Sequence, residues 1–186
     1  MDVQNEKMLT LEKFEEAAKK VKEVTSETKL IYSDFFTKET GNQVYLKPEN
    51  LQLTGAYKLR GAYYKMSTLS EEDRAKGLIT ASAGNHAQGV ALAATKNGIS
   101  SLICLPDTAP ISKVEATKGF GADVCLVEGC YDDAYQRALE LKDSEGYTFV
   151  HPFDDENVIA GQGTIALEVL SELDDIDAIV VPIGGG

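Results

Sequence analysis

The sequence predicts an α/β fold in which helices cover both faces of a parallel sheet. Short apolar runs, each long enough for one strand, alternate with longer segments of helical spacing. The connections between them are a few residues long, as in βαβ units. The runs are almost wholly apolar, as expected for strands covered on both faces. The expected strands are 77–81, 101–106, 122–127, 148–150 and 178–182, and the expected helices between them are 83–96, 112–118, 131–144 and 155–173.

The elements before the first of these strands follow from local patterns. Apolar residues at helical spacing predict a helix over 10–24, with Thr10 as its cap. The segment 29–36 is mixed, a short strand followed by a turn, and 43–47 alternates like a strand. A further helix begins near Lys58, with its apolar face at 59, 62, 63, 66 and 69.

Stop signals fix where the later helices end. The helical patterns give way to glycine at Gly98, Gly119 and Gly146, which is the usual residue just past a helix. The acidic run 71–73 indicates a solvated helix start. The glycines at 184–186 follow an apolar run and normally lead into another helix, so we expect a truncated product or one part of a longer protein.

Composition limits the classes of function. The 186 residues are enough for a sizeable core, and a net charge of −12 argues against a nucleic-acid partner. The three cysteines are odd in number and lack zinc spacing, so we expect free thiols, no metal site and a cytoplasmic protein. No signal peptide or membrane-spanning run is visible, so no membrane partner is expected.

Lys58 is the first candidate for chemistry. It follows the Gly-containing turn 54–57 and lies at the positive end of a helix macrodipole, which disfavours its ammonium form. A partly buried neutral lysine can bond covalently to an aldehyde. The alternative is a solvated lysine at a helix start.

Two further turns supply anion sites. Ser82, Asn85 and His86 lie at the end of one strand and the start of a helix, where open α/β sheets bind ligands. The backbone N–H groups at the helix start, the Ser82 hydroxyl and the Asn85 side-chain amide can together bind a carboxylate or a phenolate oxygen. The alternative is that Ser82 simply caps the helix. The glycine run can converge on a phosphate or be a flexible tail. An imine-forming lysine, an oxygen site and a phosphate site together match pyridoxal 5′-phosphate (PLP).

From about residue 10 to the end, the sequence resembles the threonine dehydratase (threonine ammonia-lyase) group of fold-type-II PLP enzymes. The resemblance lies in four segments in order: 54–62 (TGAYKLRGA), 82–89 (SAGNHAQG), 158–164 (VIAGQGT) and 181–186 (VPIGGG). It implies a tryptophan-synthase-β-like fold of two lobes, the second incomplete. Residues 54–153 would form the small lobe, 1–53 the N-terminal part of the large lobe and 154–186 the start of its remainder.

The resemblance also implies roles. Lys58 would be the Schiff-base lysine and the base for the α-proton of L-threonine, with L-serine as a second substrate and 2-oxobutanoate as the product from threonine. The cofactor would also meet Tyr57, Asn85 and the phosphate-binding Gly184, Gly185 and Gly186. Ser82, Asn85 and His86 would receive the substrate carboxylate. A homo-oligomer is expected, in isoleucine biosynthesis or threonine catabolism.

The chain departs from the family pattern at two positions, and a third position separates it from a related group. Tyr57 replaces a common phenylalanine and Ala56 a common serine. The similar serine racemases carry a serine where this chain has Ala83, which ranks racemisation below elimination. A different fold-type-II PLP enzyme and a non-catalytic fragment or interaction module are also rival interpretations.

The remaining polar residues have simpler expected positions. We expect His151 to be a packed residue at a strand end rather than a catalytic base. Arg60 and Lys65 are expected to be surface charges on their helix, and Cys104 and Cys125 are expected in the core.

Overall fold

The structure is a computed structural model that describes residues 9–182. The helices are α1 (Leu11–Val21), α2 (Asp34–Thr40), the 3-10 turn η1 (Glu49–Leu51), α3 (Lys58–Ser67), α4 (Glu71–Ala75), α5 (Asn85–Lys96), α6 (Ile111–Gly119), α7 (Tyr131–Glu145) and α8 (Glu156–Glu172). The strands are β1 (Ile31–Tyr32), β2 (Tyr45–Leu46), β3 (Leu78–Ala81), β4 (Ser101–Pro106), β5 (Asp123–Val127) and β6 (Thr148–Phe149).

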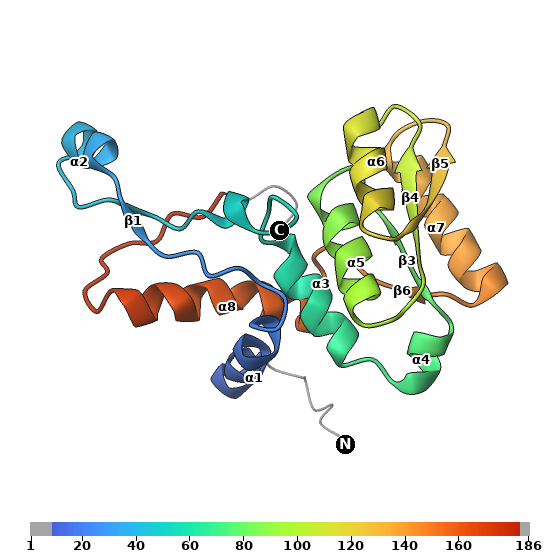
Figure 1. The fold of residues 1–186 in the computed structure, drawn as a ribbon, viewed down its shortest axis with the longest axis horizontal. Helices are drawn as coiled ribbons and strands as arrows, with labels where there is room; N and C mark the ends of the chain where they lie inside the picture. Colours follow the sequence, from blue (N-terminus) through green and yellow to red (C-terminus); the bar gives the residue numbers. More distant parts are fainter. Residues whose placement is uncertain (1–8, 183–186) are drawn as a thin grey trace, which may run out of the picture.

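A four-stranded sheet with the order β5-β4-β3-β6 forms one half of the molecule, and every pairing in it is parallel. Helices α5 and α6 lie on one face and α7 on the other (Figure 1). The apolar residues of β3 divide between the two faces: Leu78 packs toward α5, and Ile79 and Ala81 toward α7. The predicted α/β class with a helix-covered parallel sheet is therefore confirmed.

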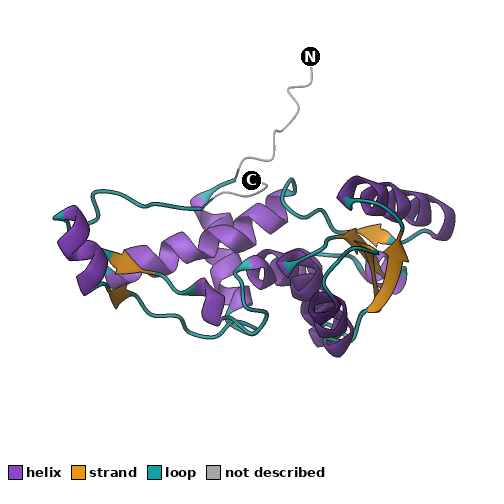
Figure 2. Cartoon of the chain, turned by 90° about the horizontal axis from the view of Figure 1, so that it is seen from above, coloured by secondary structure: helices purple, strands orange, loops and turns teal. Residues whose placement is uncertain are grey.

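Helix α3 lies between this sheet half and the helices α1 and α8 (Figure 1), and Figure 2 shows the molecule turned by 90° with its helices in purple and its strands in orange. Its residues Leu59, Ala62 and Met66 belong to the core shared with α5. Its Tyr64 packs instead with Ala17 and other residues of α1 and α8. Helix α3 is thus packed on two sides. The boundaries 1–53, 54–153 and 154–186 stay a prediction.

Glycines allow α3 and α8 to cross in backbone contact. A Cβ added to Gly161 would lie 2.6 Å from the Cα of Gly61 and 2.7 Å from the carbonyl oxygen of Arg60. A Cβ on Gly163 would overlap the ring of Phe14 in α1. The two glycines of the 158–164 segment are therefore required by packing of α8 against its two neighbours.

Arg60 is buried, contrary to the surface position expected from the sequence. Its side chain is fully inaccessible, and all five of its N–H groups donate hydrogen bonds. Two go to Glu49 at 2.8 and 2.9 Å, two to Glu168 at 2.6 and 2.9 Å, and one to Thr164 at 3.1 Å. A helix pattern could not reveal this because the partners come from other elements.

Lys65 also departs from the expected surface position, since its side chain is only 18% exposed and pairs with Asp155 at 2.6 Å. Residues 178–182 are not a strand in the structure, and Val180 is 94% exposed. An apolar run forms a strand only with a neighbour to pair with, and none of the strands within residues 9–182 pairs with it. The acidic run does begin α4, with Ser70 as its cap.

Replacing Gly161 by alanine tests the helix crossing. The added methyl group meets backbone atoms that cannot rotate away, so we expect a loss of about 1–3 kcal/mol in the free energy of unfolding. Chemical denaturation measures the change. Gly119→Ala is the matched control, because a Cβ there meets nothing within 4 Å and we expect little effect. Equal effects of the two substitutions would contradict the close contact.

Replacing Arg60 by methionine keeps the bulk and removes every donor. Glu49 and Glu168 are then left without their shared partner in a largely buried place, which costs about 3–5 kcal/mol of the free energy of unfolding. Lys118→Met, which breaks only an exposed ion pair, should change stability little. Denaturant titration of both variants measures the difference.

The same substitution should change the pH dependence of unfolding. Burial acts to raise the pKa of Glu49 and of Glu168, but hydrogen bonds from Arg60 act in the opposite direction, and both pKa values lie below the ordinary 4.5. The two carboxylates therefore stabilise the folded state fully at a pH above their unfolded pKa. This stabilisation is lost as the pH falls through their lowered pKa in the folded state. We expect the stability gap between wild type and Arg60→Met to be largest at neutral pH and to shrink in acid. A gap independent of pH would contradict the ionic network.

Candidate active site

Lys58 is the first residue of α3 and follows a turn in which Gly55 has a φ of +70°. Its Nζ donates a hydrogen bond to the carbonyl oxygen of Pro152 at 3.2 Å and lies 5.5 Å from the centre of the Tyr57 ring. Burial lowers the pKa of the Lys58 amine from its ordinary value. The side chain thus has a larger neutral fraction than a solvated lysine at the same pH.

The turn after β3 lies next to the start of α3. Ser82 is buried at its end, and Asn85 begins α5. A Cβ added to Gly89 would lie 3.1 Å from the Lys58 carbonyl carbon, so the first turns of α5 and α3 are in direct contact. The structure therefore brings the turns around Lys58 and Ser82 together.

Ser82 does not cap α5, although a helix cap was the simplest explanation for it. The N-cap position is occupied by Gly84, and within residues 9–182 no side chain accepts a capping hydrogen bond from the first turn. The Ser82 hydroxyl instead accepts a hydrogen bond from the Gly84 N–H at 3.2 Å. The N-terminal amides of α5 lack a side-chain acceptor, a state that suits an anionic group.

His86 is buried, and neither of its ring nitrogens makes a hydrogen bond of good geometry among residues 9–182, although the backbone of Val150 lies close enough to act against the lowering of its pKa. Burial and the nearby positive charge of Lys58 lower the pKa of His86 to about 3. The imidazole is consequently neutral at physiological pH and can both donate and accept. Buried polar atoms without partners are uncommon in folded proteins, and here they lie beside the lysine.

Asn85 meets a residue that sequence reasoning did not single out. Its Oδ1 accepts a hydrogen bond from Lys113 Nζ of α6 at 3.2 Å. This contact assigns the acceptor side of the amide, and the Nδ2 donor is then the side available to a ligand oxygen.

Pro152 was also missed. Strand β6 lies beside β3 in parallel register, so the residue after each strand emerges at the same sheet edge. Val150 continues this pairing through its N–H to Ile79 at 2.9 Å and accepts a hydrogen bond from the Thr80 hydroxyl at 2.7 Å. The rule that ligands lie at the carboxyl ends of parallel strands could have pointed to this turn.

The third predicted turn, Gly184, Gly185 and Gly186, lies outside the described residues. Within residues 9–182, no three His, Cys, Asp or Glu side chains are grouped to hold a metal ion. No helix in that same range has the length and apolar character needed to cross a membrane. All three cysteines are free, with Cys104 buried, Cys125 half-buried and Cys130 exposed.

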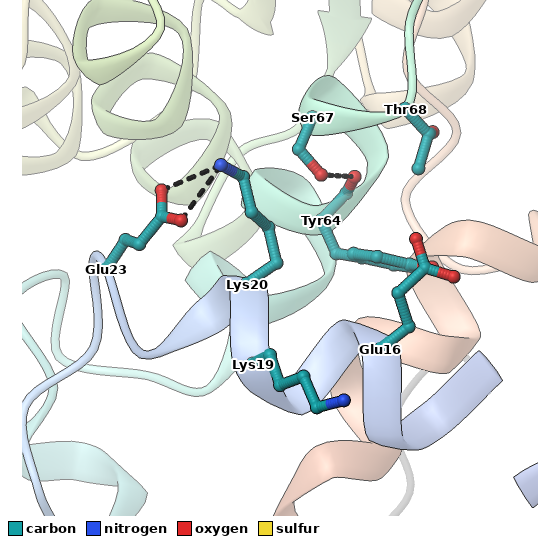
Figure 3. Close-up of a pocket in the computed structure, with 7 residues that line it drawn as sticks. All are labelled: Glu16, Lys19, Lys20, Glu23, Tyr64, Ser67 and Thr68. Carbon is teal, nitrogen blue, oxygen red and sulfur yellow. Dashed lines mark hydrogen bonds and ion pairs between the residues drawn. The ribbon is translucent and has the colours of Figure 1, made fainter. Parts of the chain in front are cut away.

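A separate surface groove lies between α1 and α3 and contains none of the predicted site residues (Figure 3). Its polar groups are already engaged in part: Lys20 pairs with Glu23 at 2.8 Å, and the Ser67 hydroxyl donates to the Tyr64 carbonyl at 2.8 Å. Its mixture of both charges favours no particular ligand. Among the described residues, the buried nitrogens of His86 without a hydrogen-bond partner lie beside Lys58, outside this groove.

The residues present fit PLP. The Lys58 amine suits an aldehyde, the Asn85 amide donor suits a phenolic oxygen, and the uncapped start of α5 suits a carboxylate. The His86 nitrogens are buried beside Lys58, which lowers the pKa of the imidazole and keeps it neutral in this part of the structure.

Comparison with known proteins agrees with this geometry. The family model described as pyridoxal-phosphate dependent enzyme matches residues 21–186. An L-threonine ammonia-lyase of Thermotoga maritima is 51% identical over 179 residues, which are 96% of this chain and 45% of that protein. A catabolic L-threonine dehydratase of Staphylococcus aureus is 46% identical over 185 residues, 99% of this chain and 54% of that protein.

Solved structures give the same relationship. Threonine deaminase isoform 2 of Solanum lycopersicum superposes with a TM-score of 0.88 at 40% identity, covering 96% of this chain and 50% of that one. Maize serine racemase gives a TM-score of 0.91 at 34% identity, covering 95% and 54%. The chain spans about half the length of the curated relatives it matches. Because the family model covers most of the sequence, the chain belongs to the family of pyridoxal-phosphate dependent enzymes.

Proposed function

We propose that this chain holds PLP at Lys58, in a protein that converts L-threonine to 2-oxobutanoate and ammonia. The observation that carries the proposal is the half-buried Lys58 amine, with its lowered pKa, beside the partnerless imidazole of His86 and the uncapped start of α5. The names of the relatives support the choice of threonine. L-Serine is proposed as a second substrate.

Each proposed role follows from one group. Lys58 would hold the cofactor through Nζ at its aldehyde carbon, and once the substrate amine has displaced it, the free Nζ would accept the α-proton. Asn85 donates from Nδ2 to the phenolic oxygen, while Lys113 holds its Oδ1. Tyr57 packs beside the lysine.

The start of α5 binds the substrate carboxylate. Ser82 and the first-turn amides, including those of Asn85 and His86, would donate to its oxygens. Gly184, Gly185 and Gly186 are proposed to bind the phosphate through their N–H groups. The neutral His86 is proposed to donate a hydrogen bond from its ring within the same site.

The elimination removes a proton from Cα and the hydroxyl group from Cβ of threonine. Bound PLP supplies the electron sink that makes the α-proton acidic. Loss of water and subsequent hydrolysis at the C–N bond give 2-oxobutanoate and ammonia, so the net reaction consumes no oxidant. The protein's own part is to orient the Cα–H bond toward Lys58 and to fix the carboxylate.

A cytoplasmic setting and a homo-oligomer are part of the proposal. Free cysteines, one of them exposed, are compatible with a reducing cytoplasm. Exposed apolar side chains on β1, α2 and β2, including Phe35 at 67% exposure, support association with a further copy. Figure 1 shows the segment that contains β1 and α2 at the end of the molecule away from the four-stranded sheet.

The first test is reductive trapping of PLP. Addition of PLP should give a visible absorbance band, and borohydride should fix the cofactor on Lys58, as read by peptide mass spectrometry. Lys58→Ala should abolish both, and Lys118→Ala, which removes an exposed lysine, should abolish neither. Because reduction makes the bond permanent, weak binding is still detected at high PLP concentration. Labelling of Lys58 no greater than that of Lys118 would overturn the proposal.

The second test separates elimination from racemisation, which the serine racemase structures and their TM-scores keep as a rival. The small methyl group of Ala83 offers no proton donor next to Ser82. The holoenzyme should therefore release 2-oxobutanoate from L-threonine and form little D-serine from L-serine. Chiral chromatography of the products measures both. D-Serine formation at a rate matching or exceeding elimination would favour the racemase interpretation.

A further inference from the structure

His151 follows β6 and has a more specific place than the packing position expected from the sequence. Its Nδ1 accepts two backbone hydrogen bonds, from Asp154 N–H at 2.8 Å and from Phe153 N–H at 3.3 Å. An acceptor cannot carry a proton, so these contacts require the imidazole to be unprotonated at Nδ1. The side chain therefore closes the 151–154 turn on itself.

Aromatic packing fixes the orientation of the imidazole ring. His151 makes edge-on contacts with Phe153 at a centroid distance of 4.8 Å, with Phe149 at 6.2 Å and with Tyr135 of α7 at 6.4 Å. Three neighbouring rings leave few orientations for the imidazole. Nδ1 is thus held facing the backbone of its own turn.

The turn carries the acceptor for Lys58. The Pro152 carbonyl accepts a hydrogen bond from Lys58 Nζ at 3.2 Å. Pro152 lies between His151 and the two residues whose N–H groups donate to the imidazole. On its other side the turn is tied to the sheet, since Val150 bonds to Ile79 and Thr80 of β3. Sheet pairing therefore fixes one end of the turn, and the imidazole fixes the other.

We propose that His151 is a positioning residue for Lys58: its imidazole holds the 151–154 turn so that the Pro152 carbonyl receives the lysine amine. The inference rests on the proposed function, in which Lys58 holds the cofactor. His151 acts through the turn and not by contact with the lysine or the reacting atoms. It determines where the Nζ lies when the lysine is not bonded to cofactor.

Two substitutions separate the acceptor from the ring. His151→Asn keeps an acceptor at the position of Nδ1, and asparagine commonly accepts from the N–H two residues ahead in such turns. His151→Phe keeps an aromatic ring among Phe149, Phe153 and Tyr135 but has no acceptor. If the hydrogen bonds matter, the asparagine variant should resemble wild type more than the phenylalanine variant does.

The first readout is amide hydrogen exchange without cofactor. His151→Phe should speed exchange of the Phe153 and Asp154 amides by about tenfold, the equivalent of one lost hydrogen bond. His151→Asn should restore most of the protection. Unchanged exchange in His151→Phe would overturn the proposal, and the Tm of each variant shows that the fold persists.

The second readout is the pKa of the Lys58 amine, measured by NMR after reductive methylation with labelled formaldehyde. A carbonyl acceptor favours the ammonium form, so its displacement in His151→Phe should lower the pKa of Lys58 by about one unit. The asparagine variant should stay near wild type. A pKa that is unchanged or raised in His151→Phe, or that falls equally in both variants, would overturn the positioning role.

Neither readout uses PLP, so the two proposals fail separately. If wild-type Lys58 is not trapped by PLP, the proposed function fails, while the exchange and titration results still decide the role of His151. If trapping succeeds and the Lys58 pKa does not respond to His151, only the positioning role is lost.

Discussion

The rest of the described structure depends on the buried ion pairs that the Arg60 guanidinium makes with Glu49 and Glu168. The guanidinium joins Glu49, which precedes the lysine turn, to Glu168 near the end of α8, and it does so from the first turn of α3. A buried charge without partners is strongly unfavourable, so all three segments must be in place together. Lys47 adds a second cation at Glu168, 2.7 Å away, and so neutralises more of the acidic pair.

This arrangement fixes the position of Lys58, the proposed cofactor lysine, at the start of a helix. Arg60 and the contact between Gly61 and Gly161 hold α3 to α8, and Gly89 lets α5 approach the Lys58 backbone. A side chain on so constrained a helix has few alternative positions. Its amine is then half-buried, which lowers its pKa and increases its neutral, nucleophilic fraction.

Lys58 and the edge of the parallel sheet come from different layers and meet at one place. The sheet supplies the turn after β3 and the turn after β6, and α3 supplies the amine. The partnerless His86 and the uncapped α5 are unfavourable for an isolated chain and become favourable when a ligand satisfies them. In this way the polar groups that folding leaves unsatisfied coincide with the proposed cofactor position.

The sequence alone determined most of the helices and strands and singled out the turns around Lys58 and Ser82, to which the proposed chemistry is assigned. Its periodicity predicted the strand at 101–106 with the bounds the structure has, and the spacing around Lys58 predicted the helix that begins there. These features are local, since they depend on residues within one or two turns of each other. The tertiary structure alone decided that Arg60 is buried, that His151 closes a turn and that residues 178–182 form no strand. The burial of Arg60 depends on a carboxylate 108 residues away, the place of the His151 turn on the pairing of β6 with β3, and a strand at 178–182 on a neighbour to pair with.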